Sequence, residues 1–164
     1  MTSFLAPSTV IIRHKKENKK KCSLQYLKEY TNIPFYTYPK DLLPDLKNHI
    51  LLTLDGPVLT SADKDMGICL LDATWKYADK MQKHVLANYP KIPFRSLPSE
   101  CMTAYPRKQT NCSNPKCGLA SIEALFLAYL ILDREPLFLL DGYIWKQSFL
   151  SLNQKFLEQY LFSL

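Results

Sequence analysis

Short apolar runs along the first half of the chain have the length and composition of β-strands. Isoleucine, valine, leucine and aromatic side chains dominate these runs, and turn-forming or charged residues separate them. The runs occupy residues 10–12, 34–38, 49–54 and 68–71. After the last run, Trp75, Ala78 and Met81 recur at spacings of three, which predicts a helix. Strands that alternate with helices in this way predict an α/β fold.

Helix is also predicted outside this region. A short helix is expected at 24–30, and two more helices are expected to finish the chain after a proline-rich segment at 90–115. In the last helix, apolar residues fall at spacings of four, three, four and four. They predict one continuous face that packs in the core, formed by Trp145, Phe149, Leu152, Phe156 and Tyr160.

The junction between the run at 68–71 and the following helix has the clearest functional pattern. Asp72 follows the strand directly, and Thr74 is of a residue type that caps helix starts. In open α/β sheets, ligands bind outside the carboxyl ends of the strands, where Asp72 and Trp75 would project. A carboxylate and an indole there can hold a ribose and an adenine, or cover a cation. The pattern alone leaves open the alternative of a helix-start aspartate and a core tryptophan.

Six segments resemble motifs of RNA aminocarboxypropyltransferases. LLDATWKYADKM (70–81) is similar to the aspartate–x–threonine–tryptophan element of the DTW-domain enzymes, and to the aspartate–x–serine–tryptophan element of the small-subunit rRNA enzymes of ribosome maturation. Five more segments resemble the second family, in the same order: KKKCSLQYL (19–27), LLTLDGPVLTSAD (51–63), RSLPSECMTAYPR (95–107), GLASIEALFLAYLIL (118–132) and YIWKQSFLSLNQKFLEQY (143–160). Together they cover nearly the whole chain.

The resemblance implies a fold and an activity. The expected architecture is a small N-terminal α/β lobe at 1–48 and a SPOUT-like domain at 49–164, with a trefoil knot around S-adenosylmethionine. The expected reaction transfers the 3-amino-3-carboxypropyl group of that cofactor to N3 of a uridine or pseudouridine in rRNA, or in a small ribosomal subunit precursor, and releases methylthioadenosine. Two alternatives stay open, a tRNA-directed enzyme and a non-catalytic ribosome-assembly factor that binds RNA.

The same resemblance implies which residues contact the cofactor. An apolar wall from Trp75 and Ala78 is expected to shield the methyl group, and the indole π-face to favour the sulfonium. Leucines are expected to flank the adenine. The full set is Ser23, Leu52, Leu54, Asp72, Trp75, Ala78 and Leu97. For Ser23, a helix N-cap at 24–30 is an equally good interpretation.

Two carboxylates are candidates for catalysis. Asp72 is expected either to accept hydrogen bonds from the ribose or to act as a base toward uracil N3. Asp63 is the second candidate, and its alternative role is a helix cap within LTSAD. A third carboxylate, Glu123, lies in an otherwise apolar helix, where burying it unpaired would be costly. It either faces the site or caps backbone amides of the preceding loop, and the structural role is favoured.

The net charge of +6 lies entirely at the start of the chain. Residues 1–40 carry eight basic and two acidic side chains, and the remaining 13 basic and 13 acidic ones cancel. Clustered basic side chains repel each other unless a polyanion neutralises them or water solvates them. The basic segment at 13–21 is therefore either an RNA-binding segment or a solvated loop. Since it precedes Cys22 and Ser23, we favour RNA. The predicted contacts here are Arg13, Lys15, Lys16, Lys19, Lys20 and Lys21.

A second RNA contact is expected at TAYPR (103–107), which stands where the family has an A-A-N-P-like loop. Tyr105, next to Arg107 and Lys108, has the chemistry to stack on a flipped-out base and to hold its phosphate. The alternative is a proline turn with surface charges.

Composition argues against several other classes of protein. The five cysteines are odd in number and contain no CxxC pair, which indicates free thiols in a reducing cytoplasm. No metal site is expected, because the spacing of Cys112 and Cys117 is unusual for zinc and no histidine lies nearby. The longest apolar run, 124–132, is too short for a membrane span, and 1–7 is too short for a signal peptide. The resemblance implies a monomer.

Overall fold

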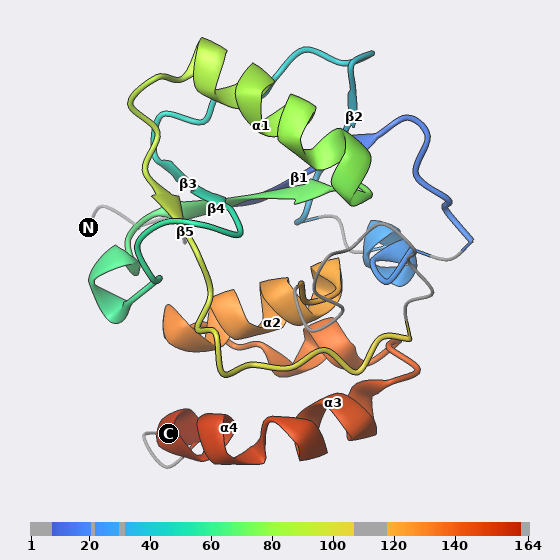
Figure 1. Cartoon of the computed structure of the whole chain (residues 1–164), viewed down its shortest axis with the longest axis vertical. Helices are drawn as coiled ribbons and strands as arrows, with labels where there is room; N and C mark the ends of the chain where they lie inside the picture. The colour runs from blue at the N-terminus through green and yellow to red at the C-terminus, as the bar shows by residue number, and fades with distance from the viewer. Residues whose placement is uncertain (1–7, 21, 30–31, 107–117, 162–164) are drawn as a thin grey trace.

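A parallel sheet of five strands forms the middle layer of the computed structural model, which describes residues 8–20, 22–29, 32–106 and 118–161 (Figure 1). The strand order is β2-β1-β4-β3-β5, and every neighbouring pair is parallel. The strands are β1 (Thr9–His14), β2 (Phe35–Tyr38), β3 (His49–Leu52), β4 (Gly67–Asp72) and β5 (Phe94–Arg95). The carboxyl ends of all five therefore lie along the same edge of the sheet.

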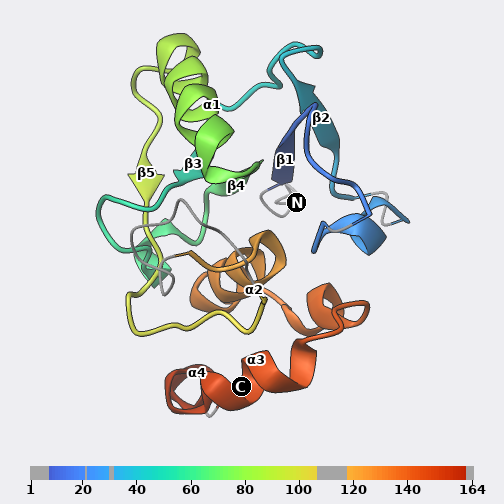
Figure 2. The same ribbon diagram turned by 45° about the vertical axis from the view of Figure 1, so that its right-hand side comes forward.

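Helices cover both faces of this sheet (Figures 1 and 2). One face carries α1 (Trp75–Asn88) and the opposite face carries α2 (Ser121–Ile131). Beyond α2 lie α3 (Lys146–Leu152) and α4 (Gln154–Leu161), which form an outer layer. Three short 3₁₀ helices complete the described part: η1 (Gln25–Glu29), η2 (Ser61–Asp63) and η3 (Leu137–Leu140).

The alternation of side chains along the strands divides the core into two. In β1, Ile11 points to the α2 side, whereas Val10 and Ile12 point to the α1 side. Met81 and Val85 of α1 cover the second group. α2 is buried almost all round because the sheet packs on one side of it and the outer layer on the other. Strands buried on both faces explain why their sequence reads as continuous apolar runs.

The predicted strands at 10–12, 34–38, 49–54 and 68–71 correspond to β1–β4, and α1 begins at Trp75 with Thr74 as its N-cap residue. The Thr74 side chain makes no capping hydrogen bond. The helix expected at 24–30 is the 3₁₀ helix η1. The expected α/β class is therefore confirmed, with a fully parallel sheet.

The continuous apolar face predicted for the last helix is wrong. The segment is two helices, α3 and α4, separated at Asn153. The Asn153 amide holds the Met102 backbone at both N–H (2.7 Å) and C=O (2.8 Å), so it serves the neighbouring loop. Because of this break, the five apolar residues do not share one buried face. Phe149 and Phe156 are buried, but Trp145 is 39% and Leu152 47% exposed.

The boundary expected after residue 48 does not separate two sheets. β4, from the second part of the chain, pairs with β1 over five residues and lies between β1 and β3. Both parts therefore share one sheet. Among the described residues, none of the helices has the length and apolar content needed to cross a membrane.

Candidate functional site

The carboxyl ends of β1 and β4 meet where the chain leaves the sheet in opposite directions. After β1 the chain passes over the face of the sheet that α2 covers. Leu24, which precedes η1, and Leu27, which lies within η1, both pack in the core on that face. After β4 the chain enters α1 on the other side. In open α/β sheets this change of direction opens a crevice between two adjacent strands, and ligands bind there.

A buried ion pair joins the two strands at this point. Arg13 and Asp72 lie opposite each other in the β1–β4 register, and Arg13 Nε donates to Asp72 Oδ2 at 2.8 Å. Each residue is only 4% exposed. Arg13 Nη2 also donates to Cys22 Sγ at 3.0 Å, and Ser121 Oγ donates to Asp72 Oδ1 at 2.9 Å. Both oxygens of Asp72 therefore accept hydrogen bonds from the protein itself.

Cys22 takes part in this network as a thiol. Burial, assisted by the negative charge of Asp72, raises its pKa to about 12, so it stays protonated at neutral pH. Its Sγ lies 3.2 Å from Asp72 Oδ2, to which it donates. The cluster thus ties the loop after β1 and the first turn of α2 to the end of β4.

Ser23 is placed beside this cluster in a role that neither sequence interpretation foresaw. Its Oγ accepts a hydrogen bond at 3.2 Å from the backbone N–H of Ile122, in the first turn of α2. It therefore satisfies an amide of a helix 99 residues away along the chain, rather than one of the helix that follows it.

The other residues predicted to bind the cofactor also follow the carboxyl ends of strands. Leu52 ends β3 and is buried, and Leu54 lies two residues later with 58% of its surface exposed. Trp75 and Ala78 are half-buried in the first turn of α1, and Leu97 is half-buried two residues after β5. The predicted set is thus gathered along one edge of the sheet, contributed by the segments after β1, β3, β4 and β5.

Asp63 lies apart from Asp72. It lies in η2, which precedes β4, whereas Asp72 ends that strand. Its carboxylate accepts two hydrogen bonds from Arg95, each of 3.1 Å, and closes a capping box with Thr60. The helix-cap interpretation is therefore confirmed, and the two candidate catalytic carboxylates do not form a pair.

Glu123 is fully buried and accepts four hydrogen bonds. Its Oε2 receives the Ala120 N–H at 2.8 Å and the Thr103 hydroxyl at 2.7 Å. Its Oε1 receives the Ala104 N–H at 2.9 Å and the Tyr143 hydroxyl at 2.8 Å. The expected capping of backbone amides is confirmed, and the carboxylate joins the 101–106 loop, α2 and the segment before α3.

The residues predicted to contact RNA have four different outcomes. Lys15, Lys16, Lys19 and Lys20 are exposed. Arg13 departs from the prediction, because its guanidinium is buried in the pair with Asp72. Tyr105 is half-buried against the α2-side core, and its N–H donates to Thr103 Oγ1 at 3.1 Å. Lys21, Arg107 and Lys108 lie outside the described residues.

The sequence analysis missed two lysines that lie on the same surface as Lys15 and Lys16. Lys76 and Lys80 line a concave region together with Lys15 and Lys16. Their spacing of four residues on a helix was the available signal, since it places both on one face.

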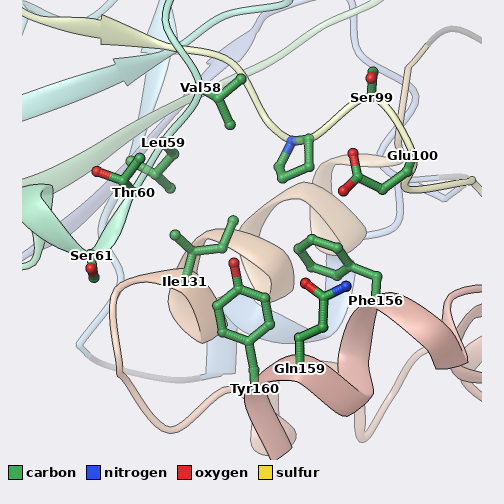
Figure 3. Close-up of a pocket in the computed structure, with 11 residues that line it drawn as sticks. Val58, Leu59, Thr60, Ser61, Ser99, Glu100, Ile131, Phe156, Gln159 and Tyr160 are labelled. Atoms are coloured by element: carbon green, nitrogen blue, oxygen red, sulfur yellow. The ribbon is translucent and has the colours of Figure 1, made fainter.

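A separate cavity of about 420 Å³ lies between the loop after β3 and α4 (Figure 3). It adjoins Leu97 in sequence through Pro98, but it includes none of the residues predicted to bind the cofactor. Its lining consists of Val58, Leu59, Thr60, Ser61, Pro98, Ser99, Glu100, Ile131, Phe156, Gln159 and Tyr160. In the described parts of the chain, no three His, Cys, Asp or Glu side chains are grouped to hold a metal ion.

Two histidines give the fold an expected dependence on pH. Burial lowers the pKa of His49, whose Nε2 bonds to Ser8 Oγ at 2.8 Å while its buried Nδ1 finds no acceptor or donor among the described residues. Burial and the charges of Lys16, Lys15 and Lys80 lower the pKa of His14. The unfolded chain therefore binds these protons more readily, and the free energy of unfolding should fall as the pH drops below about 6.5.

Urea unfolding between pH 7.5 and 5.5 measures this loss. The variant His49→Asn should lose less stability over that range than the wild-type chain. Equal slopes in the two proteins would contradict the assignment to His49.

Comparisons with known proteins add an independent line of evidence. A family model described as "Ribosome biogenesis protein, C-terminal" matches residues 50–163. The solved structure described as the SAM-dependent rRNA:acp-transferase Tsr3 from Vulcanisaeta distributa is similar, with a TM-score of 0.73 and 26% sequence identity. The match covers 95% of this chain and 83% of that chain. No curated protein sequence matches this one.

Proposed function

The chain belongs to the ribosome biogenesis protein, C-terminal family, and on this basis we propose that it is an S-adenosylmethionine-dependent rRNA aminocarboxypropyltransferase. The observation that carries the proposal is the gathering of Ser23, Leu54, Asp72, Trp75 and Leu97 at one edge of the sheet, in a fold similar to that of Tsr3. The side chains fit the cofactor chemically, since exposed and half-buried apolar groups suit the adenine and hydroxyls suit the amino acid end.

When bound, S-adenosylmethionine would supply a carbon next to a sulfonium as the electrophile. The bond from N3 of the uridine or pseudouridine to that carbon would form as the carbon–sulfur bond breaks, with loss of the N3 proton and release of methylthioadenosine. The methyl group of the same sulfonium is the competing electrophile. The main task of the protein is therefore to position the aminocarboxypropyl carbon in line and to cover the methyl group.

We assign the covering of the methyl group to Trp75 and Ala78, which lie about one helical turn apart at the start of α1. Leu52, Leu54 and Leu97 flank the adenine. Ser23 contacts the amino acid end, because a hydroxyl that accepts the Ile122 N–H still has a proton to donate to a carboxylate.

For Asp72 we propose a positioning role beside its candidate role as a base or ribose ligand. Its hydrogen bonds to Ser121 and Cys22, and its ion pair with Arg13, hold the segments that carry Ser23 and Trp75 in a fixed relation. Asp63, which precedes β4, forms an ion pair with Arg95 of β5, and we propose no catalytic role for it.

The finer relationships are also proposals. We propose that the chain is of the SPOUT class with a trefoil knot in its C-terminal part, and that it is related to the DTW-domain enzymes. Residues 1–48 would supply RNA contacts and the Ser23 contact, and 49–164 the remainder of the cofactor site. We further propose a cytoplasmic monomer that acts on rRNA, since the family is one of ribosome biogenesis.

The test uses purified protein, RNA from a strain that lacks the gene, and S-adenosylmethionine labelled either in the methyl group or in the carboxypropyl carbons. We expect carboxypropyl label alone to enter RNA, in the rRNA fraction. Methyl label alone would overturn the reaction class, and label in the tRNA fraction would overturn the substrate. Cofactor binding without transfer to RNA or to small-subunit precursor particles would favour a non-catalytic assembly factor.

A further inference from the structure

A concave region of about 390 Å³ lies at the carboxyl ends of β1 and β2, beside the first two turns of α1. Its lining combines aromatic rings with lysines and contains no acidic side chain. We call it the lysine–tyrosine site, and its residues are His14, Lys15, Lys16, Tyr38, Pro39, Lys76, Tyr77 and Lys80.

The aromatic part of this site is held rigidly. The His14 ring stacks on Tyr77, with 4.0 Å between ring centroids and an angle of 6° between the planes. Tyr38 lies 5.8 Å from His14 on centroids, and His14 Nδ1 accepts the backbone N–H of Lys16 at 3.1 Å. That hydrogen bond fixes the orientation of a neutral imidazole. Tyr38 and Tyr77 are half-buried, so each keeps part of its ring accessible.

The charged part of the site is unbalanced. Lys15, Lys16, Lys76 and Lys80 are all exposed. Lys16 Nζ and Lys76 Nζ each lie 5.7 Å from the centre of the Tyr77 ring. Like charges held around one concavity repel each other, and an anion that enters it relieves this repulsion.

The site adjoins the proposed cofactor site on two elements. His14 follows Arg13, which pairs with Asp72, and Tyr77 lies between Trp75 and Ala78 in the first turn of α1. A ligand that spans both sites needs a flat ring for the tyrosines, negative charge for the lysines, and a second unit that reaches the cofactor. A polymer whose neighbouring units carry a flat ring and a phosphate meets these needs. Single-stranded RNA has this chemistry, and its unstacked bases bind by stacking on aromatic side chains.

We propose that the lysine–tyrosine site binds an unstacked nucleotide of single-stranded RNA next to the nucleotide that is modified. The tyrosine rings stack on its base, and the four lysines contact the phosphates on either side. This inference rests on the proposed function, because the proposed function is what makes RNA the acceptor of the transferred group. RNA binding at this site does not itself depend on catalysis.

The test measures binding of a fluorescently labelled 12-nucleotide single-stranded RNA by anisotropy at several salt concentrations. The variant Lys76→Gln/Lys80→Gln should bind about tenfold more weakly and reduce the slope of log K against log salt by roughly 1.4, for two lost phosphate contacts. The variant Tyr77→Leu should also bind about tenfold more weakly, with an unchanged slope, because stacking is lost and charge is kept.

A matched control removes the same charge at the other edge of the sheet. Lys47 and Lys91 are exposed and precede β3 and β5, so Lys47→Gln/Lys91→Gln should change RNA affinity less than about twofold. If the two double variants weaken binding equally, or if the Lys76/Lys80 variant weakens binding of duplex RNA as much as that of the single strand, the proposal is overturned.

Two further measurements separate this proposal from the proposed function. Each variant is titrated with S-adenosylmethionine, whose affinity should not change in the lysine variants. The wild-type chain is assayed for carboxypropyl transfer. Absent transfer with the expected RNA effects would overturn the proposed function alone, whereas transfer with equal RNA binding by all variants would overturn the lysine–tyrosine site alone.

Discussion

Replacing Glu123 by alanine is expected to lower the free energy of unfolding by about 3–5 kcal/mol. The side chain is 0% exposed, and its two oxygens accept hydrogen bonds from the backbone of Ala120 and Ala104 and from the hydroxyls of Thr103 and Tyr143. Alanine would deprive these donors of their acceptor in a place that water reaches poorly, and would leave a cavity beside them. Urea unfolding followed by circular dichroism measures the loss.

Two further variants identify the cause of this loss. Glu123→Gln keeps one acceptor oxygen but points an amide N–H₂ at two donors, so its loss should be smaller, about 1–3 kcal/mol. Glu158→Ala removes an exposed carboxylate whose partner is Gln154 in α4, and should change stability by less than about 0.5 kcal/mol. A loss below about 1 kcal/mol in Glu123→Ala would show that the four hydrogen bonds contribute little.

The largest functional effect is expected from Trp75→Ala. This change should weaken S-adenosylmethionine binding by at least about tenfold, because it removes an aromatic contact and a π-face near the sulfonium. Transfer of the carboxypropyl group should fall with it, since the methyl group would lose its cover. Calorimetric titration of the cofactor measures the affinity, and thermal unfolding checks that the variant is folded.

The chain contains only one other tryptophan, which gives a matched control. Trp145 precedes α3 and is 39% exposed, so Trp145→Ala should leave cofactor affinity unchanged. In Trp145→Phe the remaining indole is Trp75, and its fluorescence should change when S-adenosylmethionine is added. Unchanged affinity in Trp75→Ala, or an unresponsive Trp75 signal, would remove the proposed cofactor site.

The local pattern of apolar residues predicted those strands and helices in which the buried positions follow the period of the element. β1, β3 and β4 are apolar runs buried on both faces, and β2 is a half-buried run at the edge of the sheet. α1 begins where the spacing of apolar residues changes from that of a strand to that of a helix. β5 has only two residues and lies between prolines, so no periodicity identified it. The break at Asn153 depends on a loop 51 residues earlier, which the helical pattern does not contain.

Parts of the candidate site depended on contacts between distant residues. Arg13 opens a basic segment and looks like its neighbours in sequence, yet its partner Asp72 is 59 residues away. The pairing exists because β4 lies next to β1, and strand order is not encoded in a local pattern. Asp72 and Trp75 were found because a single strand–helix junction carries both. Lys76 and Lys80 were missed because only the fold brings them beside the loop after β1.

The central place of β4 has a consequence for how the chain folds. As the polypeptide is synthesised, β1 and β2 emerge first, but one side of β1 stays without a hydrogen-bonding neighbour until residue 72 has been made. β4 then enters between β1 and β3 and pairs on both sides with strands made earlier, whereas β5, which is made later, adds beside β3 at the edge of the sheet. Residues 1–48 are therefore not expected to fold alone or to be exchangeable between relatives as a module. The strand that carries Asp72 and leads into Trp75 is the one that joins β1 and β2 to β3, so the centre of the sheet and this part of the proposed cofactor site form in the same step.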